Sequence, residues 1–306
     1  MTRPLLAVDA PSLYFRAFHG VPVSAATAPD GTPVNAVRGF LDMLATLVRT
    51  RRPGRMVCAM DADWRPSWRV ELVPSYKAHR VAYHNVETVP EELVPQIPVI
   101  EQVLAAVGIP VVGVAGYEAD DVLGTLAATQ PPPVEVVSGD RDLFQLVDDA
   151  RPVRLLYCGR GVARLEVADE AAVRARFGVP ASAYVDFAVL RGDPSDGLPG
   201  VNGIGEKTAA RLVDRYGDLA RLLAAVDDPD AGFAPGIRSK LVAAADYLAV
   251  APTVVRVARD VPLPDLPPAL PEAPVDPDRL LELAERWNLA GPCQRLVDAL
   301  AGERHG

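Results

Sequence analysis

The chain has 306 residues, of which 49% are hydrophobic and 23% are charged. This composition excludes an intrinsically disordered chain and allows one large domain, or a large domain with a smaller companion. The formal net charge is −9, from 31 Lys and Arg against 40 Asp and Glu. Such a balance argues against a nucleic-acid partner unless many of the acids are metal ligands.

The start of the chain is not a signal peptide, because its apolar run is short and is interrupted by Asp9. No stretch approaches the roughly 18 apolar residues that a membrane helix needs. The three cysteines are odd in number and widely spaced, which favours neither a disulfide framework nor a zinc site. We therefore expect a soluble, cytoplasmic protein without membrane contact.

The first half alternates short apolar runs with helical patterns, which predicts an α/β fold with a mostly parallel sheet flanked by helices. The predicted strands are residues 5–8, 56–60, 109–114, 134–137 and 153–157. The predicted helices are residues 36–50, about 97–107, 119–129 and, more briefly, 142–147. Residues 64–96 break this rhythm and are rich in aromatic, basic and proline residues.

A second, helical region is predicted for residues 184–260, after a first domain of residues 1–183. It contains a Gly-rich turn over 198–205, a helix at 207–216 and another at 238–248. Residues 261–306 form a third part. Its first stretch, 261–277, is dense in proline and predicts an extended connector. Residues 278–300 have the periodicity of one or two amphipathic helices.

Acidic residues follow four of the predicted strands at the point where each strand ends, and two more precede the Gly-rich turn. The set is Asp9, Asp61, Glu118, Asp120, Asp121, Asp140, Asp142, Asp193 and Asp196. Because the carboxyl ends of parallel strands meet at one edge of a sheet, we expect these acids to lie together. Bare, they would raise one another's pKa values, whereas Mg²⁺ or Mn²⁺ prefers such oxygen ligands.

Each acid also has an ordinary explanation, because a single Asp after a strand is often a cap or a turn residue. Nine acids that reach one edge through five segments are poorly explained in this way. Setting these nine aside leaves 31 acids against 31 bases, so the net charge decides nothing. Two ions about 3.5–4 Å apart can stabilise both the attacking and the leaving oxygen of a phosphoryl displacement.

Three ordered motifs resemble those of the 5′ nucleases, which include flap endonucleases and the 5′–3′ exonuclease domain at the start of bacterial repair DNA polymerases. They are Gly116-Tyr-Glu-Ala-Asp-Asp-Val122, Ser138-Gly-Asp-Arg-Asp-Leu143 and the run from Gly192 to Ala209. The likeness extends from Leu5 to about Tyr247. It implies a PIN-like domain, a helical arch at about 64–96 and a helix–hairpin–helix module, in a free-standing nuclease without an attached polymerase.

The resemblance also assigns the acids to two divalent ions, Mg²⁺ or Mn²⁺. Asp9, Asp61, Glu118, Asp120 and Asp121 would hold or surround the first ion. Asp140, Asp142, Asp193 and Asp196 would serve the second.

Basic and aromatic residues interleave from Trp64 to His84, a mixture that suits single-stranded DNA. By resemblance, Lys77 and Arg80 contact the scissile phosphate, where cations offset the charge that develops on the phosphoryl group. The alternative for this segment is an ordinary amphipathic excursion with a solvated basic face. The stretch 81–90 is several residues longer than in many relatives, which predicts an arch of different length or order here.

The Gly-rich turn predicts sequence-independent binding of the DNA backbone, because glycines let N–H groups approach phosphate and the following helix adds partial positive charge. The residues expected to contact DNA are Tyr14, Arg16, Gly200, Gly203, Gly205, Lys207 and Thr208. For Tyr14, simple packing is an equal alternative. The resemblance also implies a K⁺ ion at the turn, held by backbone carbonyls.

The combined hypothesis is a 5′–3′ exonuclease and flap endonuclease that hydrolyses DNA by a two-metal-ion mechanism. Its partners would be DNA with 5′ ends or flaps and a candidate DNA polymerase, and the protein would act as a monomer near the nucleoid. Two alternatives stay open. One is a PIN-type ribonuclease, although such domains lack the Gly-rich hairpin. The other is a non-catalytic protein that binds branched DNA, although it would be expected to lack some of the ligands.

Overall fold

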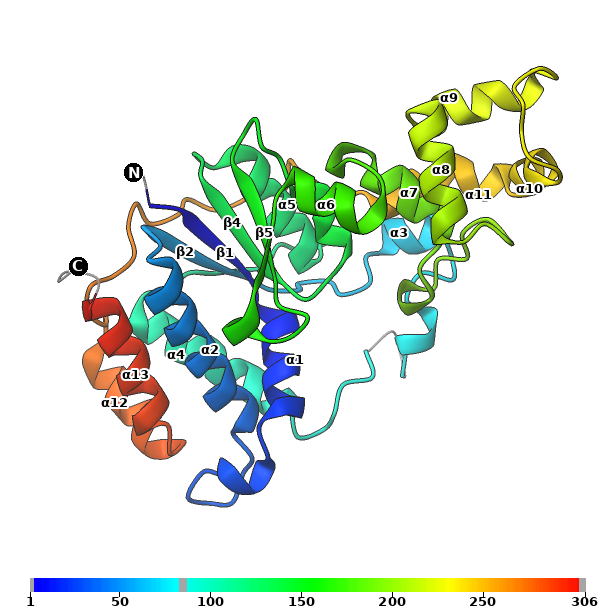
Figure 1. Cartoon of the computed structure of the whole chain (residues 1–306). Helices are drawn as coiled ribbons and strands as arrows, with labels where there is room; N and C mark the ends of the chain where they lie inside the picture. The colour runs from blue at the N-terminus through cyan, green and yellow to red at the C-terminus, as the bar shows by residue number, and fades with distance from the viewer. Residues whose placement is uncertain (1–2, 83–86, 303–306) are drawn as a thin grey trace.

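Six strands form one sheet in the order β3-β2-β1-β4-β5-β6 in a computed structural model that describes residues 3–82 and 87–302 (Figure 1). The strands are β1 (Leu5–Asp9), β2 (Arg55–Ala59), β3 (Val111–Val112), β4 (Val134–Ser138), β5 (Val153–Tyr157) and β6 (Glu166–Ala168). All neighbouring pairs are parallel except β5 and β6. The predicted fold class is confirmed.

The two faces of the sheet bury different hydrophobic clusters, because side chains alternate along each strand. In β1, Leu5 and Ala7 join one cluster, while Leu6 and Val8 join the other. Every residue of β1 is buried. A strand covered on both faces reads as a continuous apolar run, which is why the sequence predicted these strands well.

One face is covered by five helices that gather at the lower left of Figure 1. They are α1 (Ala10–Gly20), α2 (Asn35–Arg51), α4 (Ile97–Val107), α12 (Pro277–Arg286) and α13 (Ala290–Ala301). The last two form the tail, and the Arg295 guanidinium bonds both carboxylate oxygens of Asp42 on α2, at 2.7 and 3.1 Å. The tail therefore belongs to the sheet domain although the connector separates it in sequence.

The other face packs against α5 (Ala119–Thr129), the 3-10 helix Asp142–Leu146 and part of the helical module. α6 (Glu170–Phe177) joins β6 to that module. The module contains α7 (Tyr184–Arg191), α8 (Glu206–Tyr216), α9 (Leu219–Ala224), α10 (Ile237–Ala243) and α11 (Ala245–Val255). Figure 1 shows α8, α9 and α10 projecting away from the sheet, while α7 and α11 lie between.

Several elements differ from the sequence prediction. Strand β3 has only two residues instead of six. The helix expected over 238–248 is two helices, α10 and α11, that meet at Ala244. Helices α1 and α6 and strand β6 were not predicted. In the arch segment, the described residues form one helix, α3 (Ser67–Leu72), and two 3-10 turns. None of the helices in the described parts combines the length and apolar character that a membrane crossing needs.

Candidate metal centre and nucleic-acid interface

The acids predicted from the sequence lie at the carboxyl edge of the sheet and in the loop after α7. Asp9 ends β1, Asp61 lies two residues after β2, and Asp140 lies two residues after β4. Their exposure is graded: Asp9, Glu118, Asp121 and Asp142 are buried, Asp120, Asp193 and Asp196 are half-buried, and Asp61 and Asp140 are exposed. The cluster therefore has a buried floor and an open rim.

Asp9 is fixed by the turn that starts α1. Its Oδ1 accepts a hydrogen bond from the Ser12 amide at 3.0 Å, which caps the helix, and its Oδ2 accepts one from the Ser138 hydroxyl. The Ser138 hydroxyl in turn accepts a bond from the Asp140 amide at 2.9 Å. Ser138 thus joins the acid after β1 to the acid after β4.

Asp61 is fixed by a second helix start. Its Oδ1 accepts a hydrogen bond from the Ala119 amide at 2.7 Å, in the first turn of α5. This bond brings the acid after β2 against the helix that carries Asp120. The three acids Asp9, Asp61 and Asp120 therefore come from separate segments, and the side chains of Asp9 and Asp61 are each held by an amide at the start of a helix.

The charges of the acids influence one another's pKa values. Burial raises the pKa of Asp9 to about 7, and the charges of Asp61 and Asp140 add to the rise. Removal from water also raises the pKa of Asp120 and of Asp142 well above the usual range, with Asp140 as the next cause for both. Repulsion of this kind is relieved when cations bind between the carboxylates.

Glu118 and Asp121 are held by a buried cation, Arg69. Its guanidinium donates to Glu118 at 2.8 Å and to both oxygens of Asp121 at 2.8 and 2.6 Å. The guanidinium is only 2% exposed, and its Nε donates to the Val254 carbonyl of α11 at 3.1 Å. Arg69 therefore ties α5 to the helical module.

Asp121 also accepts hydrogen bonds from the Glu118 amide at 3.2 Å and from the Ala258 amide at 2.8 Å. Both of its oxygens are thus occupied, and it is fully buried. Of the two roles that the sequence left for Asp121, holding or surrounding the first ion, these hydrogen bonds favour the second.

The cations predicted to act in the reaction lie between the two groups of acids. The Lys77 ammonium contacts Glu118, and the Lys77 amide donates to the Asp196 carbonyl at 2.8 Å. Arg80 donates to Asp196 Oδ1 at 2.9 Å. Nearby negative charges raise the pKa of Lys77 despite the opposing effect of burial, so the ammonium stays protonated at neutral pH.

The rest of the arch segment differs from the prediction of a DNA-facing surface. Arg69 is buried, Arg65 donates to the Tyr76 carbonyl at 2.6 Å, and the Trp68 indole donates to the Gly116 carbonyl at 3.1 Å. These bonds point the first basic and aromatic residues inward, because each satisfies a backbone or carboxylate group that would otherwise lack a donor. Tyr83 and His84 lie outside the described residues.

Of the three hairpin glycines that were predicted to contact DNA, one is buried and two are exposed. Gly200 is buried with φ +64°, and a Cβ there would lie 2.5 Å from the Gly192 amide. Gly200 therefore permits close packing of the turn on the acid loop and does not face DNA as predicted. Gly203, Gly205 and Lys207 are exposed, and Thr208 is half-buried. The Lys240 ammonium donates to the Gly203 carbonyl at 2.9 Å.

Tyr14 and Arg16 both lie on α1 but differ in exposure. Tyr14 is 6% exposed and belongs to the hydrophobic cluster, with its ring 5.2 Å from Phe15. Packing therefore accounts for Tyr14. Arg16 is half-buried, and its Nη2 would lie 3.4 Å from a Cβ at Gly139, beside the acid loop. Its Nε is buried without a hydrogen-bond partner in the described chain.

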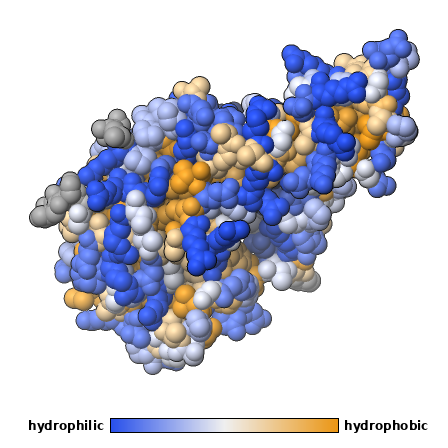
Figure 2. Space-filling view, in the orientation of Figure 1, coloured by the Kyte–Doolittle hydropathy of each residue, from blue (hydrophilic) through white to orange (hydrophobic). Residues whose placement is uncertain are grey.

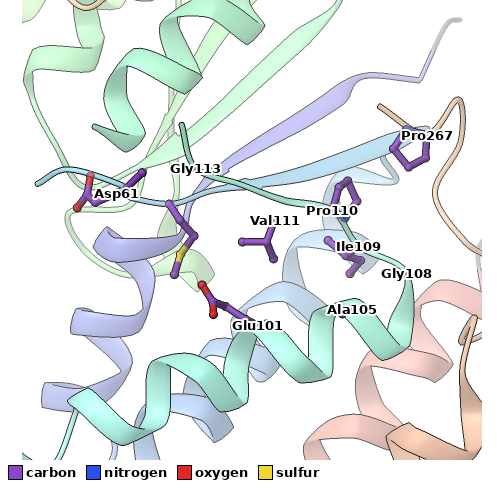
Figure 3. A pocket seen from close by; sticks show the side chains of 11 residues that line it. Asp61, Glu101, Ala105, Gly108, Ile109, Pro110, Val111, Gly113 and Pro267 are labelled. Atoms are coloured by element: carbon purple, nitrogen blue, oxygen red, sulfur yellow. The ribbon is translucent and has the colours of Figure 1, made fainter. Parts of the chain in front are cut away.

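A hollow of about 620 Å³ borders the rim of the cluster. Figure 3 shows Asp61 at one end, Pro267 of the connector at the other, and Glu101 of α4 between them. Asp61 is the only one of the nine acids in its lining. The hollow is therefore a neighbour of the acid cluster and not its centre.

The donor set fits divalent cations, although no preformed cage is visible in the described parts. Within residues 3–82 and 87–302, no three His, Cys, Asp or Glu side chains are already arranged to hold an ion. The buried Asp142 Oδ1 has no hydrogen-bond partner among these residues. An unpaired carboxylate oxygen of this kind, beside Asp140 and Asp193, is what an added cation would satisfy.

Two family models divide the whole of this arrangement between them. Residues 4–178 match the N-terminal resolvase-like domain of 5′-3′ exonucleases, and residues 179–278 match their C-terminal SAM fold. The chain belongs to the 5′–3′ exonuclease family. The predicted resemblance is thereby confirmed, and the chain is a 5′–3′ exonuclease.

The similar proteins include free-standing and polymerase-linked members. A 5′-3′ exonuclease of Streptomyces coelicolor is 60% identical over 300 residues, which cover 96% of this chain and 99% of the relative. One of Mycobacterium tuberculosis is 51% identical and covered to 98% in both chains. DNA polymerase I of Mycobacterium bovis is 38% identical, over 97% of this chain but only 32% of the polymerase.

Solved structures share the fold at low sequence identity. The T5 D15 protein, co-crystallised with metal ions, has a TM-score of 0.64 and 16% identity, with 98% of this chain and 99% of that chain covered. The catalytic core of Rad2 in complex with a DNA substrate has a TM-score of 0.60 and 17% identity, with 99% and 93% covered. A T5 5′-exonuclease structure contains zinc.

Proposed function

We propose that this exonuclease hydrolyses DNA phosphodiesters both stepwise from free 5′ ends and at the junction of 5′ flaps, with two Mg²⁺ or Mn²⁺ ions. The observation that carries the proposal is the convergence of nine acids from separate segments on one edge of the sheet. Lys77 and Arg80 lie between the two groups of acids. Divalent ions in structural relatives and the DNA in the Rad2 complex support both the cofactor class and the substrate.

The first ion would be held by Asp9, Asp61 and Asp120. Glu118 and Asp121 would surround it from the start of α5, because hydrogen bonds already occupy the oxygens of both side chains. The second would be held by Asp140, Asp142, Asp193 and Asp196. When bound, such ions supply Lewis acidity and lower the pKa of water. In this scheme the protein supplies no nucleophile of its own.

The two cations that the chain itself provides, Lys77 and Arg80, would act on the scissile phosphate. Lys77 and Arg80 are fixed by Glu118 and Asp196, and their positive charges are already in place before a phosphate arrives. Charges preorganised in this way stabilise negative charge on a transferring phosphoryl group without a reorganisation cost. They would also orient the scissile phosphate between the two groups of acids.

The hairpin would hold the duplex backbone. Gly203, Gly205 and Lys207 are exposed at the start of α8, where amide groups and a lysine can receive phosphate oxygens. Backbone carbonyls of the turn would hold K⁺, which at the Gly203 carbonyl would take the place of the Lys240 ammonium. Binding through backbone groups carries no base preference, which suits an enzyme that recognises the end of a strand.

We further propose that the protein acts as a monomer in the cytoplasm, near the nucleoid, together with a DNA polymerase. The polymerase relatives support this, because the matching segment is part of the polymerase chain itself. A separate nuclease would have to meet the polymerase at the same 5′ end.

The test uses a duplex with a 5′ single-stranded flap, labelled at either end, with Mg²⁺, Mn²⁺ or EDTA. The proposal expects metal-dependent release of the flap near the junction, and its loss in Asp120→Ala with DNA binding retained. Cleavage of a matched RNA flap at an equal rate would favour a ribonuclease. Binding without cleavage under any condition would favour the non-catalytic alternative.

A further inference from the structure

Two hollows meet at Tyr157, at the carboxyl end of β5. The smaller, about 390 Å³, is lined by Asp140 and Asp193 of the acid cluster together with Arg141 and Arg191. The larger, about 710 Å³, is lined by Arg160, Arg164 and Arg176. Because Tyr157 lines both, the two hollows adjoin at this residue, and the larger one has none of the nine acids in its lining.

The charges of the two hollows differ. In the larger one, three arginines face a single acid, Glu166, which pairs with Arg176 at 2.9 Å. Arg160 and Arg164 are exposed, and neither makes an ion pair within the described residues. Two positive charges without an ion pair therefore line the hollow that adjoins, at Tyr157, the hollow of Asp140 and Asp193.

The arginines are held in place from two sides. Arg176 lies over the Tyr157 ring at 4.8 Å and over the Phe144 ring at 5.1 Å. The segment that carries Arg160 and Arg164 is anchored by Val162 and Leu165, which pack against the hydrophobic cluster beside α1 and α2. In Figure 2 strongly hydrophilic side chains gather where the segment between β5 and α6 faces the viewer.

We propose that Arg141, Arg160, Arg164 and Arg176, here called the arginine track, bind the phosphodiester backbone of the DNA strand that leaves the acid cluster beside Asp140. Arginine suits this role because its planar donors match phosphate oxygens and remain charged at any working pH. A fully solvated basic surface would not explain two concave hollows that lead to the acids. The proposal rests on the proposed function, since it names where that DNA continues.

The test is the double variant Arg160→Gln/Arg164→Gln. The matched control is Arg49→Gln/Arg52→Gln, which removes the same charge from two exposed arginines at the end of α2, on the opposite edge of the sheet. Flap cleavage gives KM and kcat. Fluorescence anisotropy of the same DNA in EDTA gives affinity between 50 and 200 mM salt, conditions in which the affinity change per lost phosphate contact is measurable.

If the arginine track binds DNA, the KM for flap cleavage should rise on the order of tenfold at low salt in Arg160→Gln/Arg164→Gln, while kcat should be unchanged. The slope of log affinity against log salt should become shallower by roughly 1.8, or about 0.9 for each phosphate released. The control variant should match the wild type in both. Shortening one arm of the flap substrate at a time should abolish the difference for the single arm that reaches the track.

Equal affinities and salt slopes for track variant, control and wild type would overturn the proposal. So would a fall in kcat with unchanged KM, or a loss of binding to an acidic polypeptide with DNA binding intact, since the track would then serve a protein partner. A wild-type protein that binds the flap through the track yet cleaves nothing would sink the proposed function and leave the track standing.

Discussion

The replacement Arg69→Gln tests the buried link between the acid cluster and the helical module. The substitution keeps much of the side-chain volume and removes the charge. In the native chain the side chains of Arg69 and Glu118 are each 3% exposed and that of Asp121 is not exposed. The variant would therefore leave the buried Asp121 carboxylate without its cation, and Glu118 with the Lys77 ammonium alone.

The size of the effect follows from that burial. Removing one partner of a buried ion pair typically costs about 3–5 kcal/mol, because the other charge is left uncompensated. A fold of about 5–15 kcal/mol total stability would survive, with a midpoint lowered by on the order of 6–20 °C. Arg69→Lys should fall between, because lysine restores the charge but not the two-pronged geometry.

Urea unfolding of the metal-free protein measures the free energy, and flap cleavage by the folded fraction measures activity. The matched control is Arg295→Gln, which breaks an Arg–Asp pair whose side chains are 43% and 38% exposed. Exposed pairs contribute about 1 kcal/mol or less. If Arg69→Gln cost no more than the control and kept full activity, the buried link would have no energetic role and the reasoning would be refuted.

Three further outcomes are expected. Burial raises the pKa of Asp9 to about 7, so the metal-free protein should lose stability as pH rises from about 4 to 7, by at most about 1.4 kcal/mol per pH unit for this group. Urea unfolding in EDTA checks the slope, and a gain across that window would contradict it. Burial also raises the pKa of Cys58 to about 12, so iodoacetamide should not label it at pH 8 until the chain unfolds, as mass spectrometry would show. Gly200→Ala should cost about 1–3 kcal/mol and weaken duplex binding, because its Cβ would strike the Gly192 amide and distort the turn. Gly20→Ala, at the end of α1 and with no atom within 4 Å of its Cβ, is the control in the same unfolding and anisotropy assays.

The fold was predictable where local pattern and burial agree. Buried parallel strands leave continuous apolar runs, so β1, β2, β4 and β5 were located within a residue or two. Strand β6 was not predicted because it is a three-residue edge strand with two exposed residues. Helix α1 could have been found, since Asp9 caps it and a proline occupies its first turn.

The candidate site was predictable in its acids and much less so in their partners. The acids could be identified because they follow predicted strands, and this is a local feature of the sequence. Arg69 lies 49 residues before Glu118 and 52 before Asp121 in sequence, and no periodicity reports such a contact. Its position among aromatic and basic residues suggested DNA contact, whereas burial against two carboxylates makes it a positioning residue.

The arginine track could not be predicted from the sequence either. Arg160 and Arg164 lie in the short connection between β5 and β6, and only the folding of that connection brings them to a hollow that adjoins, at Tyr157, the hollow of Asp140. Sequence spacing alone gives no reason to group them with the acid cluster. The residues that contact the acids are therefore determined by packing between segments far apart in sequence, whereas the acids themselves could be found from local sequence pattern.

The most direct test of the central claim is to locate the ions. Crystals of the exonuclease with flap DNA and Mn²⁺ would be measured at the manganese absorption edge, with Asp142→Asn as the comparison. The account predicts two Mn²⁺ ions, one among Asp9, Asp61 and Asp120 and the other beside Asp140 and Asp193, with the second lost in the variant. Manganese bound elsewhere, or at no position within this cluster, would contradict it.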